Sequence, residues 1–107
     1  PDIAQSLNNI GVVYENKGDY KKALEYYKKS YEIRKIFNFN NPTNSDMATS
    51  LNCIGNVFRN RGDYEKALEY YLKSYDIRKK VYADNPNSPH IATSLNNIGL
   101  VYAPLFA

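Results

Sequence analysis

Apolar and small residues recur along the chain with the spacing of an amphipathic helix. Between residues 3 and 14 they fall at i, i+3, i+4 and i+7, on one stripe of a helix: Ile3, Ala4, Leu7, Ile10, Gly11 and Tyr14. A second stripe follows: Tyr20, Ala23, Leu24, Tyr27, Tyr31 and Ile33. Between them, Gly18 predicts the left-handed end of the first helix and Asp19 the N-cap of the second. A connection this short predicts an antiparallel helical hairpin, with helix A followed by helix B.

The sequence of the predicted hairpin occurs twice, and the first part of a third copy follows. The hexapeptide SLNNIG at 6–11 returns at 94–99, and SLNCIG stands at 50–55, so the spacing is 44 residues. A fixed period of this size indicates a stacked repeat architecture. We therefore predict an all-α solenoid of αα-hairpins forming a single domain over 1–107. Its units are repeat 1 at 3–46, repeat 2 at 47–90, a partial repeat 3 at 91–102 that supplies only helix A, and a divergent tail at 103–107.

Prolines and glycines suggest where the helices end and how they pack. Asn-Pro pairs mark the linkers at 39–45 and 83–89, because a residue before proline avoids helical geometry. Ser88 then reads as an N-cap with Pro89 at the first helical position. Pro104 is expected to end the third helix A early. Recurrent Gly11 and Ala23 predict a close approach of the backbones where helix A crosses helix B.

With no helix B after the third helix A, its apolar flank is expected to stay uncovered. The residues on it are Leu95, Ile98 and Tyr102. A solenoid that lacks a polar cap tends to stack on another copy. We therefore expect a homo-oligomer through this end of the chain.

These residues resemble the tetratricopeptide repeat. The first copy reads Leu7-x-x-Ile10-Gly11-x-x-Tyr14, Gly18-Asp19-Tyr20 and Ala23-x-x-x-Tyr27; the second has Leu51, Ile54, Gly55, Phe58, Gly62-Asp63-Tyr64, Ala67 and Tyr71. The unit is ten residues longer than the usual 34 and looks like the long repeats of kinesin light chains. The resemblance implies a right-handed superhelix, a concave surface lined by the A helices, a protein or peptide partner and no enzymatic activity. It departs from the family at Ser30 and Ser74, where alanine is usual.

The asparagines of helix A lie on the side opposite the apolar stripe, at about 100° per residue. Stacking by 44 predicts three rows: Asn8, Asn52 and Asn96; Asn9, Cys53 and Asn97; Val12, Asn56 and Leu100. An amide offers a donor and an acceptor, so it can satisfy both groups of a peptide unit. We predict a groove for an extended peptide or a partner helix, with candidate residues Gln5, Asn8, Asn9, Asn52, Asn56, Arg59, Asn96 and Asn97. The alternative is that these asparagines are solvated, or bond to one another between repeats as a structural ladder.

Charge adds a second functional hypothesis. The net charge is +3, and basic pairs at Lys21-Lys22, Lys28-Lys29 and Arg34-Lys35 alternate with tyrosines, a composition that can bind RNA. Such charges more often form the solvated outer face of helix B, so nucleic acid is the less favoured partner. A third alternative is that the chain is the non-catalytic arm of a larger signalling protein.

Candidate catalytic and metal-binding residues are few. Cys53 is the single cysteine, which excludes an intrachain disulfide and fits a reducing, cytoplasmic compartment. No base lies near it in sequence to activate the thiol, and His90, the single histidine, cannot complete a zinc site with it. The glycine turns lack the spacing of a phosphate-binding loop. No apolar run reaches the ~18 residues of a membrane span. We expect no enzyme, no cofactor, no metal and no membrane partner.

Overall fold

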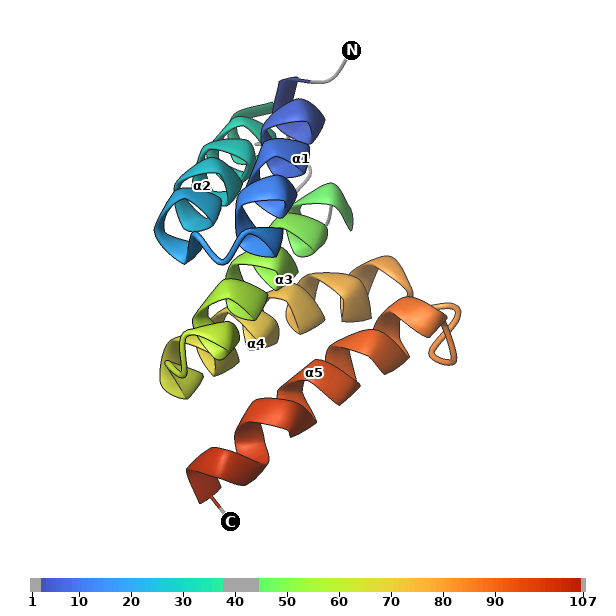
Figure 1. The fold of residues 1–107 in the computed structure, drawn as a ribbon. Helices are drawn as coiled ribbons and strands as arrows, with labels where there is room; N and C mark the ends of the chain where they lie inside the picture. Colours follow the sequence, from blue (N-terminus) through green and yellow to red (C-terminus); the bar gives the residue numbers. More distant parts are fainter. Residues whose placement is uncertain (1–2, 38–44, 107) are drawn as a thin grey trace.

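The computed structural model describes residues 3–37 and 45–106, and within them all regular secondary structure is helical. The elements are α1 (Ile3–Asn16), α2 (Tyr20–Phe37), α3 (Ser45–Asn60), α4 (Tyr64–Val81) and α5 (Pro89–Phe106). Figure 1 shows α1 and α2 as one hairpin, α3 and α4 as the next, and α5 alone at the end of the stack. The predicted all-α stack of hairpins is confirmed.

The two A–B turns form as the sequence predicts. Gly18 and Gly62 have φ values of 80° and 82°, the left-handed region that glycine enters without strain. The Asp19 carboxylate accepts from the backbone N–H of Lys22 at 3.2 Å, and Asp63 does the same for Lys66 at 3.3 Å. These caps satisfy donors that the first turn of a helix leaves unpaired. Each turn therefore fixes its hairpin locally.

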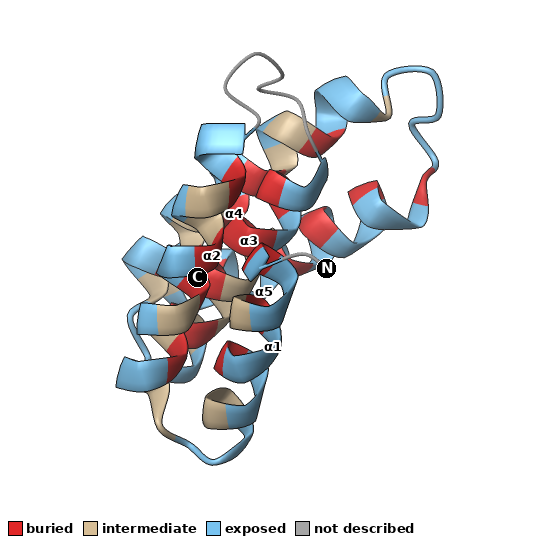
Figure 2. Ribbon diagram, turned by 90° about the horizontal axis from the view of Figure 1, so that it is seen from above, coloured by how far each residue is buried: buried red, intermediate tan, exposed pale blue. Residues whose placement is uncertain are grey.

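Consecutive helices pack on one another, so that α2 contacts α3 and α4 contacts α5 across the repeat boundaries. The buried residues lie where these helices face each other (Figure 2). Tyr27 and Tyr71, each 1% exposed, are the largest fully buried side chains. They belong to one cluster with Ile54, Val57 and Phe58 of α3. Because this cluster draws on both hairpins, neither hairpin hides its apolar face alone.

The glycine of helix A makes room for a ring and not for the opposing backbone. A Cβ atom on Gly11 would lie 2.6 Å from Cδ1 of Tyr27, and one on Gly55 would lie 2.7 Å from Cδ1 of Tyr71. The expected close approach of backbones is therefore replaced by a tyrosine ring that lies against the glycine. At Gly99 a Cβ would have no heavy atom within 4 Å, since no helix B follows α5 within the described residues.

The start of α5 agrees with the prediction and its end does not. Ser88 Oγ accepts from the backbone N–H of His90 at 3.2 Å, and α5 begins at Pro89. The helix then continues through Pro104 to Phe106, so the prediction that Pro104 ends it is wrong. The missing proline N–H costs one backbone bond in the final turn. In that turn the rings of Tyr102 and Phe106 lie with their centroids 4.5 Å apart. The linker at 39–45 falls largely outside the described residues.

The expected apolar flank of α5 is exposed. Leu95 and Tyr102 are 50% and 54% exposed, while Ile98 is half-buried. Leu100 and Phe106 add further exposed apolar surface on the same helix. α5 thus has α4 on one side and no packed helix on its outer side among the described residues.

Candidate functional site

The candidate groove residues lie on the A helices α1, α3 and α5, but they differ in accessibility. Gln5, Asn9 and Asn96 are exposed, and Asn52, Asn56 and Arg59 are half-buried. Asn8 and Asn97 are only 6% and 9% exposed. The expectation that Asn8 and Asn97 face away from the packed side of the helix is therefore wrong, because neighbouring A helices cover them.

Polar contacts between A helices connect residues 45 apart, not 44. The Asn97 Nδ2 donates to Asn52 Oδ1 at 3.0 Å, and the Asn60 Nδ2 donates to Glu15 Oε2 at 3.0 Å. Equivalent positions on two stacked, parallel helices point in the same direction, so they cannot point at each other. The residues that meet here are offset by one position beyond the repeat, which is about 100° around the helix. The bond between Asn52 and Asn97 joins the first predicted row to the second, so the alternative of asparagines that bond to one another between repeats holds for this pair.

Cys53 occupies the corresponding position at the first repeat boundary, 45 residues after Asn8. The Asn8 Oδ1 is buried and has no hydrogen-bond partner among the described residues. Burial raises the pKa of the Cys53 thiol, and a hydrogen bond from Asn8 opposes that rise only in part. A thiol with a raised pKa is a poor nucleophile at neutral pH. Cys53 therefore packs as a small side chain at the position that Asn97 occupies at the next repeat boundary.

Besides Asn52 and Asn97, three further candidate residues are held by bonds within the chain. The Gln5 Nε2 donates to Asn9 Oδ1 at 2.9 Å, and the Tyr71 hydroxyl donates to Asn56 Oδ1. Each asparagine therefore has its oxygen occupied, while its amide N–H groups have no partner among the described residues. Because the side-chain oxygens of Asn9 and Asn56 are held in this way, their N–H groups are available as donors on the face of α1 and α3.

A buried tyrosine supports each hairpin beneath this face. The Tyr27 hydroxyl donates to Glu15 Oε1 at 2.7 Å, and the other carboxylate oxygen of Glu15 accepts from Asn60. Burial first, and then the bond and charge of Glu15, raise the pKa of Tyr27. Burial raises the pKa of Tyr71 to about 12. Both hydroxyls stay protonated at neutral pH and act as donors.

Sequence reasoning missed the arginines that join the repeats. Arg34 was placed among the basic residues at the end of helix B, yet it is 5% exposed. Its guanidinium donates to Ser50 Oγ at 2.7 Å, to the backbone carbonyl of Asp46 at 3.2 Å and to Gln5 Oε1 at 2.9 Å. Arg34 thereby connects α2 to both neighbouring A helices.

The second boundary repeats the same clamp. Arg78, 6% exposed, donates to Ser94 Oγ at 2.9 Å and to the carbonyl of His90 at 3.4 Å. Burial lowers the pKa of Arg78, although a guanidinium stays charged. In the sequence, the signal for these clamps is an arginine that stands 16 residues before a serine at both repeat boundaries. Ser6, the first member of that serine series, is exposed.

Serines that replace the family's alanine also contribute to packing. Ser30 Oγ donates to the backbone carbonyl of Ala4 at 2.7 Å, and Ser74 Oγ donates to that of Ala48 at 2.8 Å. Both serines are completely buried. A buried hydroxyl needs a partner, and here the partner is the first turn of helix A, so the departure from alanine ties helix B to helix A.

Comparison with known proteins agrees with this hairpin geometry. A tetratricopeptide repeat family model matches residues 46–104, more than half of the chain, and another tetratricopeptide repeat model matches residues 4–35. The chain belongs to the tetratricopeptide repeat family. Repeats of this family generally mediate protein–protein interaction and are generally non-catalytic scaffolds.

Two individual proteins show how far the likeness extends. The tetratricopeptide repeat protein 29 of Trypanosoma brucei brucei is 43% identical over 37 residues, which cover 35% of this chain and 8% of that protein. The crystal structure of BtubC (BKLC) from P. vanneervenii superposes with a TM-score of 0.80 at 22% identity, over 96% of this chain and 39% of that one. The chain therefore spans less than half the length of either, and the structural likeness speaks for the fold alone.

Among the residues that the structure describes, no helix combines the length and the apolar composition needed to span a membrane. Within the same residues, no group of three or more His, Cys, Asp or Glu side chains is placed to hold a metal ion.

Proposed function

We propose that this tetratricopeptide repeat domain binds an extended peptide segment of a protein partner across the face formed by α1, α3 and α5. The observation that carries the proposal is the pair of half-satisfied amides at Asn9 and Asn56. Their oxygens are occupied by Gln5 and Tyr71, so their N–H groups are oriented before a ligand arrives. Donors that are already oriented lose less entropy on binding.

An extended peptide offers backbone carbonyls at regular spacing, and these are the acceptors that such amides need. Asn52 and Arg59, both half-buried on α3, and exposed Gln5 and Asn96 complete the proposed surface. Asn8 and Asn97 belong to it as support beneath the ligand, since little of either is accessible. Recognition through amides favours the peptide backbone over a particular side chain.

RNA binding by the helix B surface is the weaker alternative. Arg34 is buried in the clamp at the repeat boundary and is lost to that surface. Several of the remaining cations lie over tyrosine rings, among them Lys29 over Tyr26 at 5.1 Å and Lys35 over Tyr31 at 6.0 Å. Rings that are covered by lysines are not open for base stacking.

The experiment is selection of 12-residue peptides displayed on phage against the purified chain, followed by affinity measurement by fluorescence anisotropy. The double variant Asn9→Ala/Asn56→Ala should weaken the selected peptides about 30-fold, because two hydrogen bonds of ~1 kcal/mol each are lost. Asn87→Ala, an exposed asparagine in the linker before α5, is the matched control and should change little. Equal affinity in the double variant and the control would refute the proposed face.

We also propose self-association through α5. Its exposed Leu95 and Tyr102 and the bare Gly99 lie on the side on which the complete repeats carry a helix B. Burial of such a flank in a second copy is favourable at about 25 cal/mol per Å². Sedimentation should show a concentration-dependent dimer that Leu95→Glu abolishes; a monomer at every concentration would count against it.

A further inference from the structure

A groove with a basic rim lies on the opposite side of α3 from the proposed peptide face. It has a volume of about 400 Å³ and lies between α2 and α4. Its floor is apolar, formed by Leu51 and Ile54 of α3, which are 2% and 1% exposed. The remaining lining residues come from the two B helices: Lys28, Tyr31, Glu32, Lys35, Tyr70 and Lys73.

The charges around this groove are unbalanced. Three lysines face a single glutamate in its lining, which leaves two net positive charges. Lys73 lies 3.7 Å from Glu69, and Lys35 lies over Tyr31. Lys28 has neither an ion pair nor a ring partner among the described residues. The rim is thus complementary to a ligand with carboxylates, and Lys28 is the cation most available to it.

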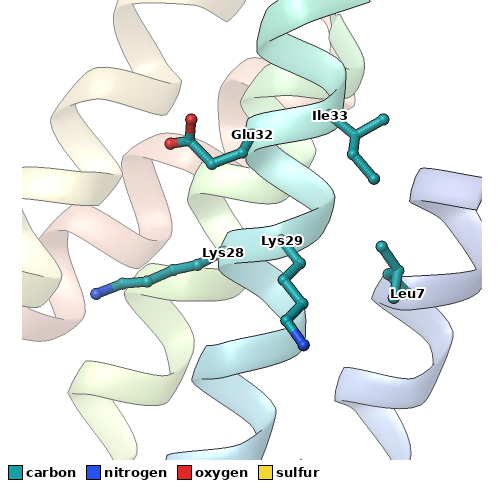
Figure 3. A pocket seen from close by; sticks show the side chains of 5 residues that line it. All are labelled: Leu7, Lys28, Lys29, Glu32 and Ile33. Carbon is teal, nitrogen blue, oxygen red and sulfur yellow. The ribbon is translucent and has the colours of Figure 1, made fainter.

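A neighbouring recess has a similar lining, but only one B helix, α2, borders it. It has a volume of about 420 Å³ and is lined by Leu7, Lys29 and Ile33 together with Lys28 and Glu32. Figure 3 shows Lys28 and Glu32 projecting to the side of α2 away from Leu7. Leu7 and Lys29 are the first-repeat counterparts of Leu51 and Lys73. The closed groove therefore arises only where two B helices flank one A helix.

The groove is independent of the asparagine face. At about 100° per residue, Leu51 and Ile54 point about 150° away from Asn52 and Asn56 around α3. Substitutions in one surface can therefore leave the other intact. The basic rim is also local: in the second repeat Leu72 stands at the position of Lys28, so the basic row does not continue.

We propose that this groove, formed by α2, α3 and α4, binds a short acidic peptide segment that carries one apolar side chain. The apolar side chain lies on Leu51 and Ile54, and its flanking carboxylates face Lys28, Lys35 and Lys73. A floor that is apolar and a wall that contains Glu32 suit such a peptide better than RNA, which needs a continuous row of cations along its backbone.

The test uses the fluorescein-labelled peptide Glu-Asp-Leu-Asp-Glu and fluorescence anisotropy. Lys28→Glu/Lys73→Glu is the groove variant. Lys21→Glu/Lys80→Glu is the control: it has the same net charge, and its substitutions are on the same two helices at exposed residues outside the groove lining. The groove variant should weaken the peptide at least about tenfold and the control by less than about twofold. Circular dichroism checks that both variants fold.

Two further measurements separate this proposal from its rivals. Asn9→Ala/Asn56→Ala should leave the acidic peptide unaffected, so failure of the asparagine face and failure of the groove are distinguishable. Equal weakening by the groove variant and the control would indicate non-specific attraction and overturn the proposal. So would the absence of saturation up to about 1 mM peptide. Tighter binding of a uridine oligonucleotide, lost in the groove variant, would assign the groove to RNA instead.

Discussion

Replacing Cys53 with asparagine should stabilise the protein by adding, at the first repeat boundary, the amide hydrogen bond that joins neighbouring A helices at the second. At the second repeat boundary, Asn52 Oδ1 accepts from Asn97 Nδ2 at 3.0 Å. At the first boundary Asn8 Oδ1 is buried without a partner among the described residues; the Asn8 amide donates to Cys53, and the thiol is only a weak donor in return. In Cys53→Asn the new Nδ2 can occupy the position that Asn97 Nδ2 occupies one repeat later, once the Asn8 amide has turned its Oδ1 towards it.

The size of the gain follows from the environment. A net hydrogen bond contributes about 1 kcal/mol, and a buried acceptor without a partner costs about 1–3 kcal/mol. Asparagine and cysteine have similar helix propensities. Cys53 is half-buried, so the larger amide has an open side. We expect the free energy of unfolding to rise by about 1 kcal/mol and Tm by about 4 °C.

Thermal and urea unfolding followed by circular dichroism at 222 nm measure both quantities. Asn8→Ala provides the control, because it removes the acceptor: in Asn8→Ala/Cys53→Asn the gain should vanish, which a double-mutant cycle detects. The reverse substitution, Asn97→Cys, should lower the free energy of unfolding by about as much as Cys53→Asn raises it. A gain that survives without Asn8, or no gain at all, would refute the interpretation of the ladder.

Three other predictions test the packing. Gly55→Ala should lower the free energy of unfolding by about 2 kcal/mol, because its Cβ would meet the Tyr71 ring. Gly99→Ala, with open space around it, should raise the free energy of unfolding by about 1 kcal/mol. Equal effects of the two substitutions in chemical denaturation would contradict this. Ser50→Ala should cost about 2 kcal/mol, since it removes a buried acceptor of Arg34, and exposed Ser6→Ala should change the stability by less than about 0.5 kcal/mol; a similar loss in both would argue against the clamp. The folded state raises the pKa of Tyr71 to about 12, so its contribution to stability is complete below about pH 10 and is lost as the pH rises towards 12; Tm measured from pH 8 to 11 should fall less steeply in Tyr71→Phe.

The repeat and the hairpin could be predicted because their signals are local. The 3.6-residue spacing of apolar positions, the glycine and aspartate of each turn, and the 44-residue period are all legible within one unit. Pro104 misled the prediction of the end of α5, because a proline removes one backbone hydrogen bond and crowds the carbonyl four residues earlier without forcing the chain out of the helix, and α5 runs two residues beyond it.

The functional face was harder to predict, because burial there depends on the neighbouring hairpin. The sequence correctly separates the asparagines of helix A from its apolar stripe, but it cannot show that Asn8 and Asn97 lie under an adjacent A helix. Nor can it show that Arg34 turns inward while Lys35, the next residue, stays exposed. Both are basic side chains at the end of helix B, and only the position of Ser50 on α3 distinguishes them.

The sequence alone determined the type of each element, the antiparallel hairpin and the period of the stack, since these depend on contacts within one 44-residue unit. Tertiary structure decided which polar residues pair between units, because facing positions on stacked helices are offset by a part turn that no single unit contains. It also decided which glycines are covered by a tyrosine ring and where the two B helices leave a basic groove. Those features exist only at the boundary between hairpins, where a second unit supplies the opposing surface.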